Sequence, residues 1–227
     1  MGWEWRIFYK DPNHSPWRSE RQDEIENMFM MASSDKQPYY YFNLRDPEAG
    51  LKERWEKIPK LELKVRQDVR EQLELWEKCM SYPLPSKSAE DRGIDVETIR
   101  RCLQMAKNEA RGQGVISNKS VEAIKRIRDR LEHQKPARVT ISKERRQIVA
   151  LTDETGYWTL LLEKTDHPDA VIIERTSIST SQGPQTFMTI CVEGENPQSV
   201  RKFVQAFVQI AVGNIMGYPE FLMALGS

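Results

Sequence analysis

Alternation of apolar and charged residues is the clearest pattern along this chain, and it is strictest in the segment LELKVR at 61–66. Strict alternation is the period of a β-strand, whose successive side chains point to opposite faces. One face of this predicted strand is aliphatic, and the other carries Glu62, Lys64 and Arg66. A surface strand also has a polar face in water, so the mixed charge becomes informative only when other strands repeat it.

The remaining hydrophobic patterns divide the chain into zones. Residues 3–67 predict mainly strands, in WEWRIFY, EIENMFMMAS, YYYFNLR, GLKERW and LELKVR. Residues 68–134 predict helices, in DVREQLELWEKCM, VETIRRCLQMAKNEAR and VEAIKRIRDRLEHQ. Residues 136–195 return to strands, and a helix over about 197–213 is followed by the short helix YPEFLMAL.

Several predicted helices have candidate capping residues. Asp95 precedes the second helix, and either Asn118 or Ser120 can cap the third. Asn196 precedes the C-terminal helix, and Pro197 suits its first position because proline lacks the N–H that this position leaves unused.

Strands on both sides of a helical segment predict an α+β fold. We expect a single domain, residues 1–227, with an antiparallel, barrel-like or tunnel-like sheet, a helical insertion at about 68–134 and a C-terminal helix. The start of the chain, MGWEWR, is charged, and no apolar run reaches the roughly 18 residues of a membrane helix. We therefore expect an intracellular, cytoplasmic location and no membrane partner.

Composition narrows the possible functions. Lys+Arg and Asp+Glu both number 34, so net charge gives no indication of nucleic acid, and any anion site must be local. The three cysteines, Cys79, Cys102 and Cys191, are widely spaced, which fits a reducing compartment and argues against a disulfide framework or structural zinc site. With only three histidines in the chain, a His-ligated metal centre is disfavoured.

Charged faces recur on other predicted strands. By alternation, the sets that share a face are Glu4 with Arg6, Lys52 with Arg54, Lys143 with Arg145, and Cys191 with Glu193 and Glu195. In an open sheet these faces meet water. In a barrel they can line a polar interior, where Arg and Lys bind phosphate oxygens and carboxylates hold Mg²⁺ or Mn²⁺. Both geometries are compatible with the pattern.

The order of these motifs resembles the CYTH superfamily, the triphosphate tunnel enzymes that include thiamine, inorganic and RNA triphosphatases and class IV adenylate cyclases. WEWR resembles the family's first acidic strand, and GLKERW its basic pair. LELKVR resembles the strand with an inward Lys, and KERR its Lys-x-Arg strand. CVEGEN resembles the Glu-x-Glu motif that runs into a helix. The resemblance implies a tunnel fold and a metal-dependent hydrolase of a triphosphate or related phosphoryl compound.

Roles for individual residues follow from this resemblance and from the shared faces. The expected catalytic residues are Glu4 and Lys64. Expected ligands of Mg²⁺ or Mn²⁺ are Glu4, Glu193 and Glu195. The expected substrate-binding residues are Arg6, Lys52, Arg54, Glu62, Arg66, Lys143 and Arg145, with Glu62 orienting a neighbouring base or assisting the metal. The expected partner is a triphosphate-containing small molecule or polyphosphate.

The first strand departs from the family pattern. Family members usually carry two or three glutamates and a lysine there, whereas WEWRIF offers only Glu4 and Arg6. At least one acid near the metal is therefore missing. Glu174 stands where the family tends to place an acid. The alternative hypothesis is a catalytically inactive binding or adaptor module for a polyanion or a protein partner, with the helical region and MGYPEFLMAL as partner surfaces.

Overall fold

The structure is a computed structural model, and it describes residues 1–10, 15–54, 58–84, 94–113, 116–181 and 183–225. Its internal contacts divide the chain into two compact units. Unit 1 comprises Met1–Gln37, Asp68–Leu75 and Ser142–Gly217, and unit 2 comprises Pro38–Gln67, Trp76–Ile141 and Tyr218–Ser227. The expectation of a single domain remains a prediction.

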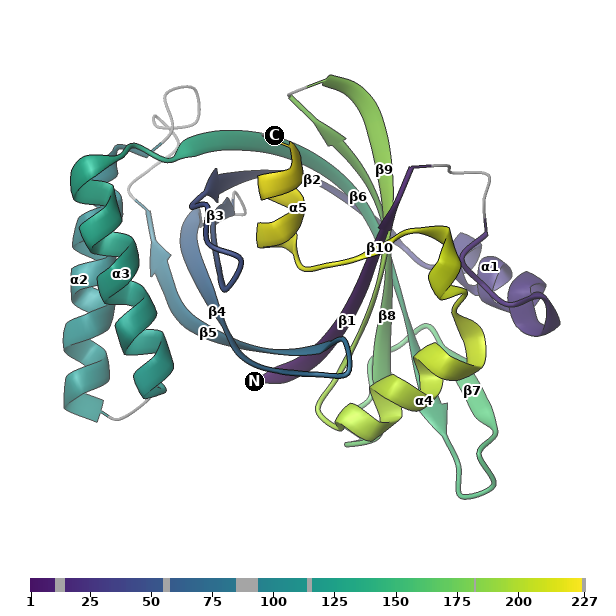
Figure 1. Ribbon diagram of the computed structural model, residues 1–227. Coiled ribbons are helices and arrows are strands. Elements are labelled where there is room, and N and C mark those ends of the chain that lie inside the picture. The colour runs from purple at the N-terminus through teal and green to yellow at the C-terminus, as the bar shows by residue number, and fades with distance from the viewer. Residues whose placement is uncertain (11–14, 55–57, 85–93, 114–115, 182, 226–227) are drawn as a thin grey trace. The chain divides into compact units, whose positions relative to one another are not determined.

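Strands and helices follow one another as an α+β chain (Figure 1). The strands are β1 (Gly2–Tyr9), β2 (Ser34–Asn43), β3 (Ala49–Arg54), β4 (Lys60–Arg70), β5 (Leu73–Pro83), β6 (Ala137–Thr152), β7 (Trp158–Leu161), β8 (Val171–Thr180), β9 (Gly183–Gly194) and β10 (Asn214–Ile215). The α-helices are α1 (Gln22–Met31), α2 (Val96–Gln113), α3 (Asn118–His133), α4 (Pro197–Phe207) and α5 (Tyr218–Leu225). Among the described residues, no helix is long and apolar enough to cross a membrane.

The strand pairings confirm the predicted fold class. Hydrogen-bonded neighbours follow the order β10-β1-β5-β4-β3-β2-β6-β8-β9, and β1 also pairs β9. The order of pairings therefore returns to its start, as in an antiparallel, barrel-like sheet. The registered pairs β1–β9, β8–β9, β2–β3 and β3–β4 are all antiparallel.

The apolar core of unit 1 lies on one face of β1, β8 and β9. Helix α4 packs there, and burial of its apolar side chains against the strands is the main stabilising term. Buried members of this core include Trp3, Trp5, Ile7, Ile173, Ile190, Val192, Val200, Phe203 and Val204. The other face of these three strands is left to the charged residues of the same alternation.

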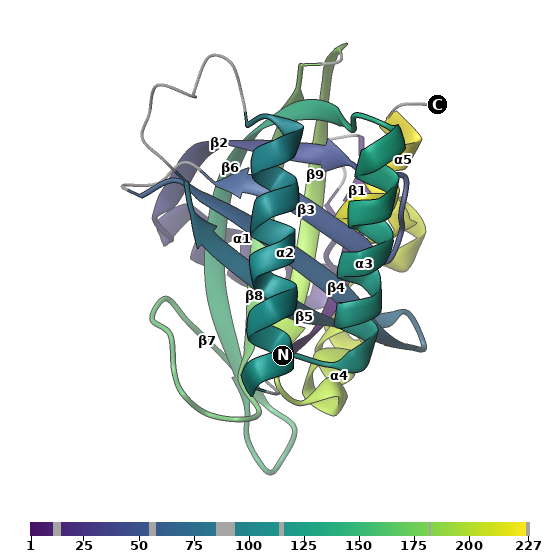
Figure 2. The ribbon, with the colours of Figure 1, turned by 90° about the vertical axis from the view of Figure 1, so that its left-hand side faces the viewer.

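The core of unit 2 forms in the same way against two longer helices. Figure 2 shows α2 and α3 side by side across β3, β4 and β5. The buried aliphatic residues include Leu51, Leu61, Leu63, Val65, Ile99, Leu103, Ile124 and Ile127. The aliphatic residues of β4 are buried under these helices, and this burial explains the alternation of LELKVR.

The prediction of a strand in EIENMFMMAS is wrong, since most of that segment forms helix α1. Ile25 and Phe29 are four residues apart and both buried, as the inner face of a helix requires. Phe29 stacks on Trp17 with ring centroids 5.9 Å apart. The Arg146 guanidinium, from β6, donates to the carbonyls of Phe29 and Met30 at 3.0 and 3.1 Å, so it caps the end of α1.

The prediction of a helix in DVREQLELWEKCM, and with it the start of the helical insertion at 68, is also wrong. This segment is the end of β4, a tight turn and β5. Glu71 and Gln72 have φ values of 49° and 71°, the positive values of a two-residue hairpin turn. Such turns usually carry Asn-Gly or Asp-Gly, so Glu-Gln does not indicate a turn. The apolar residues Val69, Leu73, Leu75 and Trp76 lie near helical spacing, which favours a helix. The described helices of the insertion begin at Val96.

Two of the predicted caps are confirmed, and one is wrong. Thr98 N–H donates to Asp95 at 2.7 Å, and Asn196 accepts from the N–H of Gln198. Helix α3 is capped by Ser117 rather than by Asn118 or Ser120. The Ser117 hydroxyl also donates to the buried Glu77 carboxylate at 2.8 Å. Ser117 therefore joins α3 to β5.

Replacing Ser117 with Ala should destabilise the protein through this junction. The change removes the helix cap and one hydrogen bond to a buried carboxylate, so the free energy of unfolding should fall by about 1–2 kcal/mol. Urea unfolding of Ser117→Ala beside Ser81→Ala, which alters an exposed serine of β5, measures the effect. Equal midpoints for the two variants would contradict it.

Candidate functional site

The predicted charged face of unit 2 is assembled by the register of β3 on β4. Lys52 lies opposite Glu62, Arg54 opposite Lys60, and Gly50 opposite Lys64. These residues alternate with the aliphatic residues under α2 and α3, so they share the other face. The structure therefore brings together Lys52, Arg54, Glu62 and Lys64 on one face, as predicted.

Glu62 is the centre of this face. It is only 4 % exposed, and its carboxylate lies 3.3 Å from Lys52 Nζ, 3.5 Å from Lys78 Nζ and 3.9 Å from Arg54 Nη1. Burial alone would raise the pKa of Glu62, but the charges of Lys52, Lys78 and Arg54 outweigh it and lower that pKa. One ionised carboxylate thus holds three cations close together.

Burial disfavours the charged form of Lys52. Burial lowers its pKa to about 8, with Glu62 opposing this shift and the charges of Lys64 and Arg54 adding to it. Its Nζ also lies over the Tyr39 ring, 5.5 Å from the centroid. A phosphate oxygen beside Lys52 would relieve the repulsion between these cations and favour its charged form.

Helix α5 occupies part of the same face. Glu220 of α5 accepts a hydrogen bond from Arg66 Nη1 at 3.0 Å. Tyr218 stacks on Tyr41 of β2, with ring centroids 5.3 Å apart and planes 14° apart. The carboxylate of α5 is therefore a partner of Arg66, where the sequence predicted a substrate phosphate.

In unit 1 the predicted charges meet across three strands. Arg6 on β1 lies opposite Cys191 on β9, which lies opposite Glu174 on β8. The next row places Glu4 opposite Glu193. Arg6 Nε donates to Glu4 Oε1 at 2.9 Å, and both residues are 8 % exposed. The structure thus brings Glu4, Arg6 and Glu193 together.

Glu174 connects two further predicted basic residues, Lys143 and Arg145, to this cluster. Its carboxylate lies 3.7 Å from Arg6 Nη1 and 3.7 Å from Arg145 Nη1. It also accepts hydrogen bonds at 3.0 Å from Gln147 and from Thr176. Burial would raise the pKa of Glu174, but the charges of Arg6, Lys143 and Arg145 and the Thr176 hydrogen bond lower it. Arg145 also contacts Asp35 at 2.6 Å.

A possible metal site is formed by Glu4, Cys191 and Glu193. One ligand atom from each lies within 4.8 Å of the others. Glu195 is not in this group, because it follows the last residue of β9 and is exposed. The fit to Mg²⁺ is poor, since Mg²⁺ prefers oxygen ligands whereas Cys191 offers sulfur, and Arg6 already binds the Glu4 carboxylate. Burial raises the pKa of the Cys191 thiol well above its usual value, which favours its neutral form.

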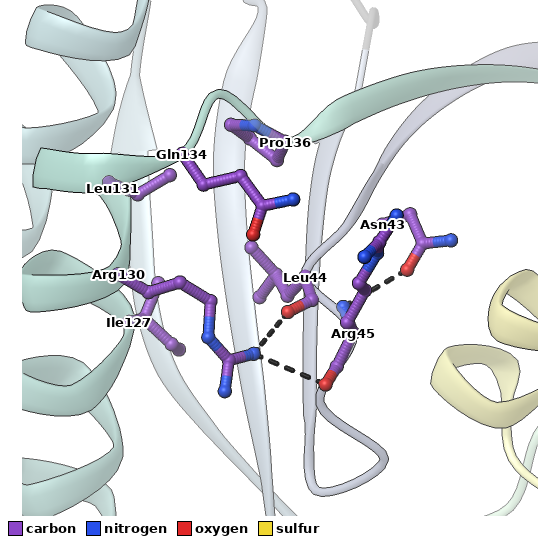
Figure 3. Close-up of a pocket in the computed structure, with 8 residues that line it drawn as sticks. All are labelled: Asn43, Leu44, Arg45, Ile127, Arg130, Leu131, Gln134 and Pro136. Atoms are coloured by element: carbon purple, nitrogen blue, oxygen red, sulfur yellow. Dashed lines mark hydrogen bonds between the residues drawn. The ribbon is translucent and has the colours of Figure 1, made fainter.

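A pocket elsewhere in unit 2 has a different character (Figure 3). Its lining residues are Asn43, Leu44, Arg45, Ile127, Arg130, Leu131, Gln134 and Pro136. Arg130 Nη1 donates to the backbone carbonyls of Leu44 and Arg45. The pocket contains none of the predicted site residues, and the Arg130 bonds tie α3 to the loop after β2.

Comparisons with known proteins give distant similarities. No protein-family model matches the sequence, and no curated protein matches it. The chain is similar to HpAC1 from Hippeastrum, provisionally assigned as an adenylyl cyclase and described as having a dominant triphosphatase activity. That alignment has a TM-score of 0.46 and 12% identity, and covers 100% of this chain and 88% of that one.

A second solved structure is similar at the same level. It is a provisionally assigned adenylate cyclase from Bacillus halodurans, with a TM-score of 0.44, 14% identity and coverage of 100% of this chain and 92% of that one. The alignments are too distant to assign a family or an activity to this chain.

The low pKa of Lys52 predicts a pH-dependent affinity for polyphosphate. Lys52 is charged below its pKa of about 8 and neutral above it, so its contribution to anion binding is present at pH 7 and is lost as the pH rises past 8. The ratio of tripolyphosphate affinities of the parent and Lys52→Met, measured by calorimetry, removes the titration of the anion itself. This ratio should fall between pH 7 and 9, and a constant ratio would contradict the assignment.

The contact between Glu220 and Arg66 predicts that α5 competes with an added anion. Glu220→Gln removes the competing charge from a partly exposed pair, so tripolyphosphate affinity should rise about twofold to fivefold. Glu122→Gln, which alters an exposed acid of α3, is the matched control. If both variants bind equally, Glu220 does not compete.

Proposed function

We propose that this protein binds the polyphosphate group of a triphosphate-containing compound on the charged face of unit 2. The observation that supports this is the placement of Lys52, Arg54 and Lys78 within 3.3–3.9 Å of one buried carboxylate. Bringing cations together at this density is unfavourable without an anion. A polyphosphate beside Glu62 would add negative charge near these cations and favour their charged forms.

The arrangement of the basic residues favours the unit 2 face over the unit 1 cluster as the anion site. On the unit 2 face, Lys52, Arg54 and Lys78 lie within 3.9 Å of Glu62, and Lys64 is near enough to lower the pKa of Lys52. In unit 1, Arg6, Lys143 and Arg145 are matched by nearby acids, and Glu174 alone interacts with all three. Several separate donors gathered around one carboxylate suit the repeated oxygens of a polyphosphate, so unit 2 is the better candidate for the primary anion site.

Metal-dependent hydrolysis of the bound triphosphate is the second candidate function. It is supported by the trio of Glu4, Cys191 and Glu193, whose ligand atoms could contact one ion. A bound Mg²⁺ or Mn²⁺ would supply charge stabilisation for phosphoryl transfer. Glu4 would first have to release Arg6, so binding without catalysis is the function that the geometry supports better.

The Lys64→Ala variant tests the proposed anion site. Lys64 lies next to Lys52 and lowers its pKa, so its removal relieves repulsion in the free protein and should leave stability near or above that of the parent. Loss of a charge-assisted contact of about 1.5–3 kcal/mol should weaken tripolyphosphate binding roughly tenfold to a hundredfold. Isothermal titration measures both affinities.

Lys125→Ala is the control for this measurement, because Lys125 is an exposed lysine of α3. It should bind like the parent. Equal affinities for Lys64→Ala, Lys125→Ala and the parent would mean that the charges of LELKVR only face water. Phosphate release from tripolyphosphate, nucleoside triphosphates and thiamine triphosphate with Mg²⁺ or Mn²⁺ tests the second candidate, and release that Glu4→Gln abolishes would favour hydrolysis.

A further inference from the structure

The position of Arg6 within the acidic cluster of unit 1 carries an inference beyond anion binding. Arg6 lies on β1 directly opposite Cys191, and two residues from Glu4 on the same face. Its guanidinium contacts Glu4 at 2.9 Å on one side and Glu174 at 3.7 Å on the other. A permanently charged group is therefore held between two acids.

A guanidinium in this place has the same electrostatic effect on the acids as a bound cation. Arginine stays protonated at every accessible pH, so the neutralisation of Glu4 and Glu174 does not depend on a soluble ion. The side chain of Arg6 is 8 % exposed and that of Glu4 is 10 % exposed. Few water molecules can therefore screen Arg6 from a neighbouring metal ion.

A divalent ion that bound Glu4, Cys191 and Glu193 would meet this charge at close range. Glu4 contributes to both arrangements, since its carboxylate is a member of the trio and the acceptor for Arg6 Nε. Repulsion between a dication and a buried guanidinium would oppose metal binding, and the ion would compete with Arg6 for the same oxygens. The residues of this cluster therefore do not fit a resident Mg²⁺ or Mn²⁺.

We propose that Arg6 is the built-in cation of the unit 1 cluster and that the protein works without a divalent metal there. This inference concerns unit 1 alone. It can hold whether or not unit 2 binds polyphosphate, so failure of either of these two proposals leaves the other intact, whereas it opposes the second candidate function, metal-dependent hydrolysis that uses Glu4.

The experiment is a titration with Mn²⁺ alone, followed by electron paramagnetic resonance of the free ion. The parent should show no binding that depends on Glu4, so the parent and Glu4→Gln should give the same curve. Arg6→Met releases the acids and should bind Mn²⁺ at least about tenfold more tightly than the parent, since a like charge has been removed from the site. Arg175→Met, which alters the neighbour of Glu174 on the opposite face of β8, should bind like the parent.

Two results would overturn the proposal. One is Mn²⁺ binding by the parent that Glu4→Gln weakens tenfold or more. The other is a folded Arg6→Met, as judged by circular dichroism, whose Mn²⁺ affinity equals that of the parent. If Arg6→Met does not fold, the comparison of the parent with Glu4→Gln still decides, because identical curves support the built-in cation and different curves reject it.

Discussion

The charged faces of this protein depend on one constraint, the burial of the aliphatic residues that alternate with them. In β4, Leu61, Leu63 and Val65 are fully buried under α2 and α3. Each buried CH₂ group contributes about 0.8 kcal/mol to the stability of the fold. This burial fixes the register of the strand, so the residues that alternate with the aliphatic ones must lie on the opposite face. The cations around Glu62 are thus held together by apolar packing on the far side of the strand.

The same constraint acts in unit 1 with a different electrostatic result. Burial of the tryptophans of WEWR places Glu4 and Arg6 on the opposite face of β1, beside β9. There the charges are paired, because Arg6 contacts both Glu4 and Glu174. Glu174 also interacts with the charges of Lys143 and Arg145. On the unit 2 face, by contrast, Lys52, Arg54 and Lys78 gather around Glu62, so the two faces differ in chemistry although alternation produces both.

Alternation therefore made much of the site predictable. Strands β1 and β4 and the shared faces of Lys52 with Arg54 and of Lys143 with Arg145 follow from period alone, and the structure agrees. Features fixed by tertiary contacts were not predictable. Helix α1 has strand-like composition but is capped by Arg146 from β6, and the Glu71–Gln72 turn lacks the usual turn residues.

Long-range partners were the other features that sequence reasoning missed. Lys78 was placed on a helix, yet it contacts Glu62 from β5. Cys191 shares a face with Glu193, so the alternation already indicated that its sulfur lies beside the predicted metal ligands. On the aliphatic face of β3, Glu53 is completely buried and bound by Arg138 at 3.0 Å. No local pattern indicates that pair, because its two members are distant in sequence and meet only through folding.

The central claim is that buried aliphatic residues hold a cation-rich face in unit 2 that binds polyphosphate without a metal. Calorimetric titration of the parent with tripolyphosphate in excess chelator, at low salt and at about 1 M salt, tests it most directly. The predicted result is saturable binding in chelator that weakens strongly at high salt, as expected for a site built from several cations. Binding that appears only when Mg²⁺ or Mn²⁺ is restored, or no binding in either condition, would contradict the claim.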